Sequence, residues 1–442
     1  MTNYLTGDGR SDAGRGVSRR QLLAAGAGGL ALSLGGRGAF AAGAENVLKI
    51  GFVSPRTGAL AGFGETDGYV LELARKALAG GLTVGGKTYE VQILDRDTQS
   101  DPSRASQLAK TLINSDGVDL MLPVSTPETI NPVADACEAA GVPCLSTVMP
   151  WEAWYFGRGG KPGAPSPFKW TYHFGFGGGE FFKTYTSLWN SLDTNKKVGV
   201  LYPNDADGNA IRENLAPALG KAGFTIIDPG PYEDGTTDYS AQIALFKKEK
   251  CEIFNTFPIP PDFAAFWRQA AQQGYTKMVK IGQIAKTGLF PSQVDSLGDL
   301  GFNLSSAAYW HKAFPYKSSL TGVSGDELAD GYEKSSGKQW TQQLGASMSL
   351  FDAGIAALKA SADPKSKEAV AKALGALNTL TMIGKVDFTS GPFPNVSPGP
   401  IIGSQWVKAK PGSKFKLDFV VTEHATDPNV PIAAKLVAYN GK

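Results

Sequence analysis

Short apolar runs alternate along the chain with longer amphipathic segments. The first apolar run covers 47–55, helical spacing follows at about 64–79, and a second run covers 89–97. Asp101 and Pro102 then stand where an N-cap and a first helical residue belong. This alternation predicts an α/β fold with a largely parallel sheet covered by helices on both faces.

The series of elements restarts after about residue 195. Five short matches recur in the same order: Ile50–Pro55 with Val198–Pro203, Ile93–Asp95 with Ile226–Asp228, Gln107 with Gln242, Pro123 with Pro258, and Leu145 with Ile281. Generic βα units also align by chance, but five matches in order favour two similar, doubly wound α/β lobes.

Three extended passages are predicted to connect these lobes. They cover 168–174, 303–314 and 384–409, and the first follows a loop rich in proline and glycine. Three crossings would form a hinge beside a ligand cleft. The expected division is 1–44 as a signal peptide, 45–172 with 306–390 as lobe 1, and 173–305 with 391–442 as lobe 2.

The N-terminal segment has the features of an export signal. Arg19 and Arg20 precede an apolar stretch of about fourteen residues that is too short to span a bilayer. Ser18–Leu23 (SRRQLL) resembles the twin-arginine motif, and small-x-small cleavage patterns occupy 39–44. We interpret 1–44 as a twin-arginine signal peptide, cleaved near Ala41 to Ala44, which directs a folded protein to the periplasm.

Composition narrows the possible partners. The 442 residues include 43 Lys and Arg against 41 Asp and Glu. This near balance argues against nucleic acid or an anionic membrane as a partner. Cys137 and Cys144 either form a disulfide or are two small buried residues, and Cys251 fits the second description. The cysteines and histidines lack the spacing of metal ligands, so no metal is expected.

Four stretches carry a resemblance to a known family: 50–64, 119–146, 238–274 and 384–391. They resemble the leucine/isoleucine/valine-binding type of periplasmic solute-binding protein, which delivers its ligand to an ABC transporter. The resemblance implies a type I periplasmic binding fold that closes like a Venus flytrap. It also implies a permease partner in the inner membrane, no cofactor and a mostly monomeric state.

Candidate ligand contacts lie in the loops at the carboxyl ends of the strands, where α/β folds bind ligands. The resemblance implies that the loops at Ser125-Thr126 and Ser146-Thr147 hold a ligand carboxylate, although the same residues also fit plain helix caps. The predicted ligand-binding residues are Thr57, Phe63, Ser125, Thr126, Ser146, Thr147, Trp151, Tyr202, Asn204, Asp207, Phe257 and Gln283.

The loop after the strand at 278–283 departs from the family pattern. Amino-acid binders of the family place an acidic residue there to pair with the ligand's ammonium, whereas this chain has Ile284 or a neighbour, beside Lys286. A buried ammonium without a partner costs several kcal/mol. We therefore predict a small aromatic or otherwise apolar carboxylate as the ligand. Asp207 could supply a cation partner instead, which keeps a branched-chain or other amino acid as the alternative.

Aromatic residues crowd the predicted hinge and favour a flat ligand. Trp151 is the first candidate for a ring in contact with the ligand. The others are Trp154, Tyr155, Trp170, Tyr172, Phe174, Phe176 and Trp310, most of which are expected to pack the hinge core.

Two other classes of function remain open. An exported enzyme would need a cofactor site or a catalytic cluster, but the glycine-rich stretch at 175–182 lacks the spacing of a nucleotide loop. Asp205 and Asp207 fit a solvated or helix-capping pair better than a catalytic one. We therefore expect no enzyme activity. A ligand-sensing receptor component would use the same fold as a transport protein.

Overall fold

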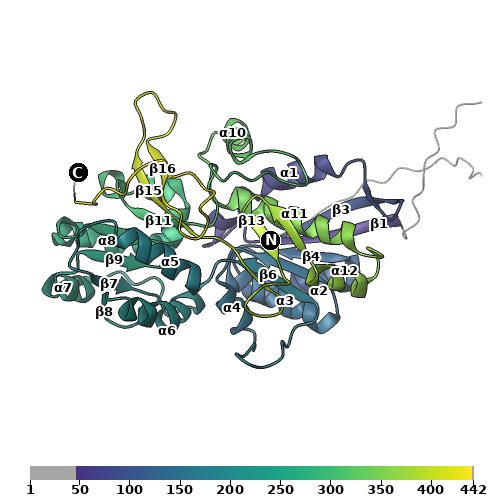
Figure 1. Ribbon diagram of the computed structural model, residues 1–442, viewed down its shortest axis with the longest axis horizontal. Helices are drawn as coiled ribbons and strands as arrows, with labels where there is room; N and C mark the ends of the chain where they lie inside the picture. Colours follow the sequence, from purple (N-terminus) through teal and green to yellow (C-terminus); the bar gives the residue numbers. More distant parts are fainter. Residues whose placement is uncertain (1–45, 441–442) are drawn as a thin grey trace, which may run out of the picture. The chain divides into compact units, whose positions relative to one another are not determined.

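Two seven-stranded sheets organise the computed structural model, which describes residues 46–440. Each sheet lies in its own α/β lobe (Figure 1), as predicted, and the described residues belong to one compact unit. The expected signal peptide and its cleavage sites lie outside the described residues. Within 46–440, no helix combines the length and the apolar character needed to cross a bilayer.

The first sheet has the order β14-β6-β5-β4-β1-β3-β2, and all its neighbours pair in parallel except β2 with β3. Its strands are β1 (Val47–Ser54), β2 (Leu82–Val84), β3 (Lys87–Asp97), β4 (Leu120–Pro123), β5 (Cys144–Thr147), β6 (Thr171–Gly175) and β14 (Val396–Pro398). One face packs on α2 (Pro102–Thr111) and α3 (Pro127–Ala140). The other packs on α1 (Asp67–Ala77), α11 (Gln343–Ala360) and α12 (Lys367–Gly375).

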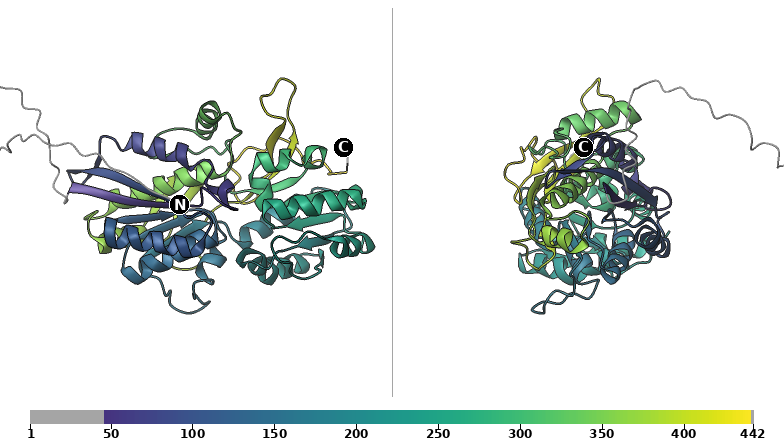
Figure 2. Two further views of the ribbon diagram at one scale, coloured as in Figure 1. Left: turned by 180° about the vertical axis from the view of Figure 1, so that it is seen from behind. Right: turned by 90° about the vertical axis from the view of Figure 1, so that its right-hand side faces the viewer.

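The second sheet has the order β16-β15-β11-β10-β9-β7-β8. Its strands are β7 (Lys197–Leu201), β8 (Thr225–Ile227), β9 (Ile253–Thr256), β10 (Ile281–Ile284), β11 (Ser305–Ala308), β15 (Ile402–Lys408) and β16 (Leu417–Glu423). The helices around it are α5 (Gly178–Trp189), α6 (Ala206–Lys221), α7 (Ser240–Lys248), α8 (Pro260–Gln272) and α9 (Pro291–Asp295). Figure 2 shows the same arrangement from behind.

Shorter elements complete the two lobes. They are α4 (Trp151–Tyr155), α10 (Gly325–Ser336), β12 (Asn378–Thr381), β13 (Gly384–Asp387), the 3₁₀ helices η2 (Ala61–Gly64), η4 (Tyr275–Lys277), η5 (Lys286–Leu289) and η6 (Gly298–Gly301), and the π-helical η3 (Leu112–Asp116).

The internal repeat is visible in the strand register. Ile50 lies opposite Ile93 in the first sheet, and Val198 lies opposite Ile226 in the second, as the sequence matches require. The match of the two prolines is displaced by two residues. Pro123 lies opposite Val53, but Thr256 rather than Pro258 takes the equivalent place opposite Leu201.

The chain passes between the sheets three times within the described residues. It leaves the first sheet after β6, returns after β11 and crosses again between β14 and β15. The middle of this last crossing is hydrogen-bonded to the first, since Gly399 N donates to the Gly175 carbonyl (2.8 Å). The division into lobes by residue range stays a prediction. In the structure, β6 and β14 belong to the first sheet and β11 belongs to the second sheet.

The three cysteines are free and buried in the structure. Cys137 on α3 and Cys144 on β5 belong to the same apolar cluster under the first sheet. Burial raises the pKa of the Cys137 thiol well above its usual value, which favours the neutral form. These residues therefore have the environment of the second alternative, small buried side chains.

A buried carboxyl links α1 to α11 on the other face of the first sheet. Asp67 is fully buried, and Ser347 donates a hydrogen bond to its Oδ1 (2.9 Å). Asp67 Oδ2 is also buried and has no hydrogen-bond partner among the described residues. Burial raises the pKa of Asp67 to about 6, although hydrogen bonds and Arg56 act in the opposite direction.

Candidate functional site

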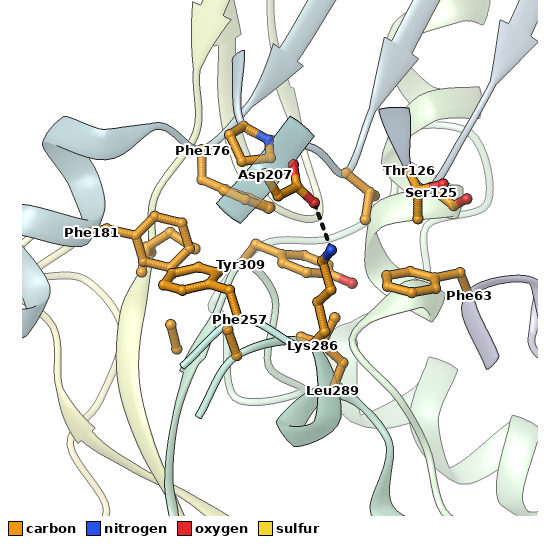
Figure 3. Close-up of a pocket in the computed structure, with 15 residues that line it drawn as sticks. Phe63, Ser125, Thr126, Phe176, Phe181, Asp207, Phe257, Lys286, Leu289 and Tyr309 are labelled. Atoms are coloured by element: carbon orange, nitrogen blue, oxygen red, sulfur yellow. Dashed lines mark ion pairs between the residues drawn. The ribbon is translucent and has the colours of Figure 1, made fainter. Parts of the chain in front are cut away.

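A largely apolar cavity lies where the carboxyl ends of strands from both sheets meet (Figure 3). The space between its wall atoms, part of which is open to solvent, is about 520 Å³. Both lobes and the crossings contribute to its wall: Phe63, Ser125, Thr126, Val148, Pro150, Phe176, Phe181, Asp207, Phe257, Ala285, Lys286, Leu289, Ala307, Tyr309 and Ile401.

Two hydroxyl groups form a polar spot on this wall. Ser125 and Thr126 follow β4, and their hydroxyl oxygens are buried without a hydrogen-bond partner among the described residues. Thr126 occupies the N-cap position of α3, yet its side chain makes no capping hydrogen bond. The alternative of a plain helix cap therefore does not describe Thr126. Both hydroxyls stay free to bind a ligand, beside the partial positive charge of a helix N-terminus.

The backbone around this spot is strained. Ser125 has φ of 116°, and Val148, in the equivalent loop after β5, has φ of 79°. Residues with a side chain rarely adopt positive φ, and such strain tends to collect at binding sites. The surrounding fold therefore holds Ser125 on the cavity wall in a conformation that costs free energy.

Aromatic rings line much of the remaining wall. Phe176 and Tyr309 are stacked with their ring centroids 5.3 Å apart, and Phe181 meets Phe257 edge-on at the same separation. Figure 3 shows Phe181 and Phe257 on one side of Lys286, with Phe63, Ser125 and Thr126 on the other. The arrangement suits a small ligand with an apolar body and one polar end.

An ion pair completes the cavity. Lys286 Nζ lies 3.2 Å from Asp207 Oδ2 and 2.7 Å from Asp205 Oδ2. Burial, opposed by Lys286 and supported by Asp205 and Glu128, raises the pKa of Asp207 to about 6. Because Lys286 pairs with both carboxylates, a paired-carboxylate mechanism has little support in the geometry.

The structure brings five of the predicted binding residues together on the cavity wall: Phe63, Ser125, Thr126, Asp207 and Phe257. It places the other seven elsewhere. Thr57 donates to Asp97 (2.7 Å) on the surface, and Asn204 donates to Glu233 (2.8 Å). Their involvement in binding stays a prediction.

Four more of these residues are buried within strands or directly after one. The Ser146 hydroxyl lies 2.9 Å from His173 Nδ1, and burial lowers the pKa of that imidazole to about 3. Tyr202 donates to Asn255 Oδ1 (2.8 Å). Thr147 and Gln283 lie inside β5 and β10 and do not line the cavity.

Trp151 packs in the hinge instead of lining the cavity. Its ring lies 5.8 Å from Phe156 and 5.5 Å from Phe393, which stands between β13 and β14. Trp154 stacks on His173 in the same region. Among the rings that the sequence placed at the hinge, Phe176 lines the cavity, and most of the others pack the core.

Sequence reasoning missed Phe181, Leu289 and Tyr309 as wall residues. Tyr309 stands one position before Trp310, which was the residue named from the pattern; Trp310 is fully buried against Trp340. Successive side chains of an extended segment point in opposite directions, so Trp310 lies in the core whereas its neighbour Tyr309 lies on the cavity wall. For Phe181, an aromatic residue directly after the glycine-rich crossing was an available signal.

Among residues 46–440, no group of three or more histidine, cysteine or acidic side chains is placed to hold a metal ion.

Comparison with known proteins supports the fold. A leucine-binding protein from Thermotoga maritima superposes with a TM-score of 0.67 at 18% identity, covering 86% of this chain and 99% of that one. A solute-binding protein from Rhodopseudomonas palustris in complex with 3,4-dihydroxybenzoic acid superposes with a TM-score of 0.67 at 19% identity, covering 87% and 99%.

Among curated sequences, an uncharacterized protein of Methanocaldococcus jannaschii is 25% identical over 205 residues, which cover 44% of this chain. The chain spans about half the length of that relative (46%). A family model described as periplasmic binding protein matches residues 47–396. The match covers most of the chain, and the chain belongs to the periplasmic binding protein family.

Proposed function

We propose that this protein captures a small aromatic or otherwise apolar carboxylate between its lobes and delivers it to an ABC importer in the inner membrane. One observation carries the ligand class: two buried hydroxyls without partners among the described residues belong to Ser125 and Thr126, which line a cavity whose other walls are mostly apolar. Binding and release need no covalent chemistry, so the proposal assigns no enzyme activity.

The two hydroxyls and the N-terminus of α3 suit a carboxylate. The rings of Phe176, Phe181, Phe257 and Tyr309 would cover its apolar body. The dihydroxybenzoate complex of the Rhodopseudomonas palustris protein supports this ligand class, although the leucine-binding neighbour keeps an amino acid as the alternative.

The wall has parts from both lobes, which gives a ligand a means of changing their arrangement. Phe63 belongs to the first lobe and meets Phe290 of the second edge-on, with centroids 5.0 Å apart. A ligand that touches both lobes binds best when they are close together, and so shifts the equilibrium toward the closed form. The permease would then select the closed, loaded form.

A panel of ligands tests the proposal. The thermal unfolding midpoint of the purified mature protein would be measured with benzoate, 4-hydroxybenzoate, cinnamate, L-leucine and L-valine. At a ligand concentration about 100 times Kd we expect roughly 2.7 kcal/mol of stabilisation, and hence a midpoint several degrees higher, for at least one aromatic acid. Small-angle scattering of that complex should give a smaller radius of gyration.

Strong stabilisation by leucine or valine, with no response to the aromatic acids, would replace the ligand class by the alternative. If neither group of compounds shifts the midpoint, the ligand proposed here is wrong.

The export route is part of the same proposal. Arg19 and Arg20 stand directly before the apolar run, so we expect their joint replacement by lysine to abolish or strongly reduce export of the folded protein. Fractionation of cells would show the precursor retained in the cytoplasm, and a mature chain that begins between Ala42 and Glu45 in the wild type. Undiminished export of the Arg19→Lys, Arg20→Lys variant would indicate a general secretory signal instead.

A further inference from the structure

The cavity contains a cation supplied by the chain itself. Lys286 opens η5 after β10, and its ammonium contacts Asp205 Oδ2 (2.7 Å) and Asp207 Oδ2 (3.2 Å). The Asp207 contact is the dashed line in Figure 3. Asp205 is fixed in turn, because its Oδ1 accepts a hydrogen bond from Gly208 N (2.6 Å) at the start of α6. All these residues belong to the second lobe, so the ion pair does not depend on closure.

This ammonium is largely buried and is influenced by acids from both lobes. The Lys286 side chain is 12% exposed and that of Asp207 is 9% exposed. Burial opposes the charge of Lys286, but Asp207, Asp205 and then Glu128 of α3 outweigh it and raise the pKa of the lysine. Lys286 therefore stays protonated, and without it Asp207 on the cavity wall would lose its cation while Asp205 and Glu128 add negative charge nearby.

We infer that Lys286 takes, from within the chain, the place beside Asp207 that the ammonium of a ligand would otherwise occupy, and so restricts the cavity to ligands without a positive charge. This inference rests on the proposed function and identifies the residue that sets its specificity. A second ammonium beside Asp207 would lie close to Lys286 in a poorly screened site, where like charges repel strongly. Asp207 Oδ1, buried and without a partner among the described residues, remains an acceptor for a neutral donor such as a hydroxyl.

Two pairs of ligands that differ only by an ammonium group test this role. They are 4-methylpentanoate with L-leucine, and 3-phenylpropanoate with L-phenylalanine. Calorimetric titration at pH 7.5 should show that the wild-type protein prefers the member without the amine. In Lys286→Met we expect the ratio of the two affinities to move by at least about tenfold toward the amino acid, because the freed carboxylates attract its ammonium.

Two further variants show whether charge is the cause. Lys286→Arg keeps the positive charge and should keep the wild-type preference. Adding Asp207→Asn to Lys286→Met should remove most of the gain. Lys338→Met is the matched control, since this lysine is 61% exposed and its partner is Glu65, away from the cavity wall. Lys286→Gln replaces Lys286→Met if the latter fails to fold.

The inference is overturned if neither Lys286→Met nor Lys286→Gln changes the ratio of the two affinities, or if the wild-type protein already prefers either amino acid. Where the wild type binds neither member of a pair, the amino acid should bind to Lys286→Met. The absence of such binding would count against the inference. The proposed function is judged separately, by the response of the wild-type protein to the aromatic acids.

Discussion

Joint replacement of Ser125 by alanine and Thr126 by valine is expected to weaken binding of the best aromatic acid about a hundredfold or more. A hydrogen bond to a charged group contributes about 1.5–3 kcal/mol, and the double variant removes two such donors. Valine keeps the branched shape of Thr126, and alanine keeps the size of Ser125 apart from its hydroxyl. Both hydroxyls lack other partners among the described residues, so the folded state should lose little. Titration calorimetry would give the change in Kd.

Thr83→Val is the matched control. The Thr83 hydroxyl is exposed on β2, lies 2.9 Å from the Thr88 hydroxyl and does not line the cavity, so this variant should bind as the wild type does. An unchanged Kd in the folded double variant would show that the carboxylate is held elsewhere.

As the pH rises from about 4 to 7, the buried Asp67 carboxyl is expected to lower the stability of the wild type by about 3 kcal/mol. Asp67→Asn is expected to abolish this decrease. The pKa of Asp67 is raised from 3.8 to about 6 in the folded protein, and one pKa unit corresponds to about 1.36 kcal/mol. Below pH 3.8 both states are protonated. As the pH rises, the unfolded chain ionises first, which favours unfolding until the folded carboxyl also ionises near pH 6.

Denaturant unfolding of the two proteins at several pH values would measure this effect. In the variant, the amide oxygen of the introduced asparagine can still accept the hydrogen bond from Ser347, so the contact between α1 and α11 is kept. Asp330→Asn serves as the control because Asp330 is exposed on α10. Parallel stability curves for the wild type and Asp67→Asn would contradict the raised pKa.

Regular elements could be predicted from sequence because each carries its own local signal. Asp101 caps α2 through a hydrogen bond from Arg104 N (2.6 Å), and Pro102 is the first helical residue, as the pattern indicated. The internal repeat could be predicted for the same reason, since β1 and β7 have similar patterns of apolar residues. The displacement of Pro258 could not be predicted, because strand register depends on partners that are distant in sequence.

The site could be predicted only in part. Ser125 and Thr126 could be predicted as candidates because they lie just after a strand, where ligand-binding loops begin. The pairing of Lys286 with Asp207 joins residues far apart along the chain, and no local pattern predicts it. Trp151 was named because large rings stabilise flat ligands, but the same property makes such rings good hinge packing. Composition alone cannot separate the two uses.

The three crossings between the sheets also limit how the two lobes could move relative to each other. The crossing between β14 and β15 is hydrogen-bonded to the first crossing through Gly399 and Gly175, and its far end pairs with the second through Ile402 and Ala308. Segments that are hydrogen-bonded to one another cannot slide past each other without breaking those bonds, so a relative motion of the two lobes would have to involve all three crossings together. In the proposed function, a membrane partner would then need to sense only the arrangement of the lobes, whichever ligand had set it.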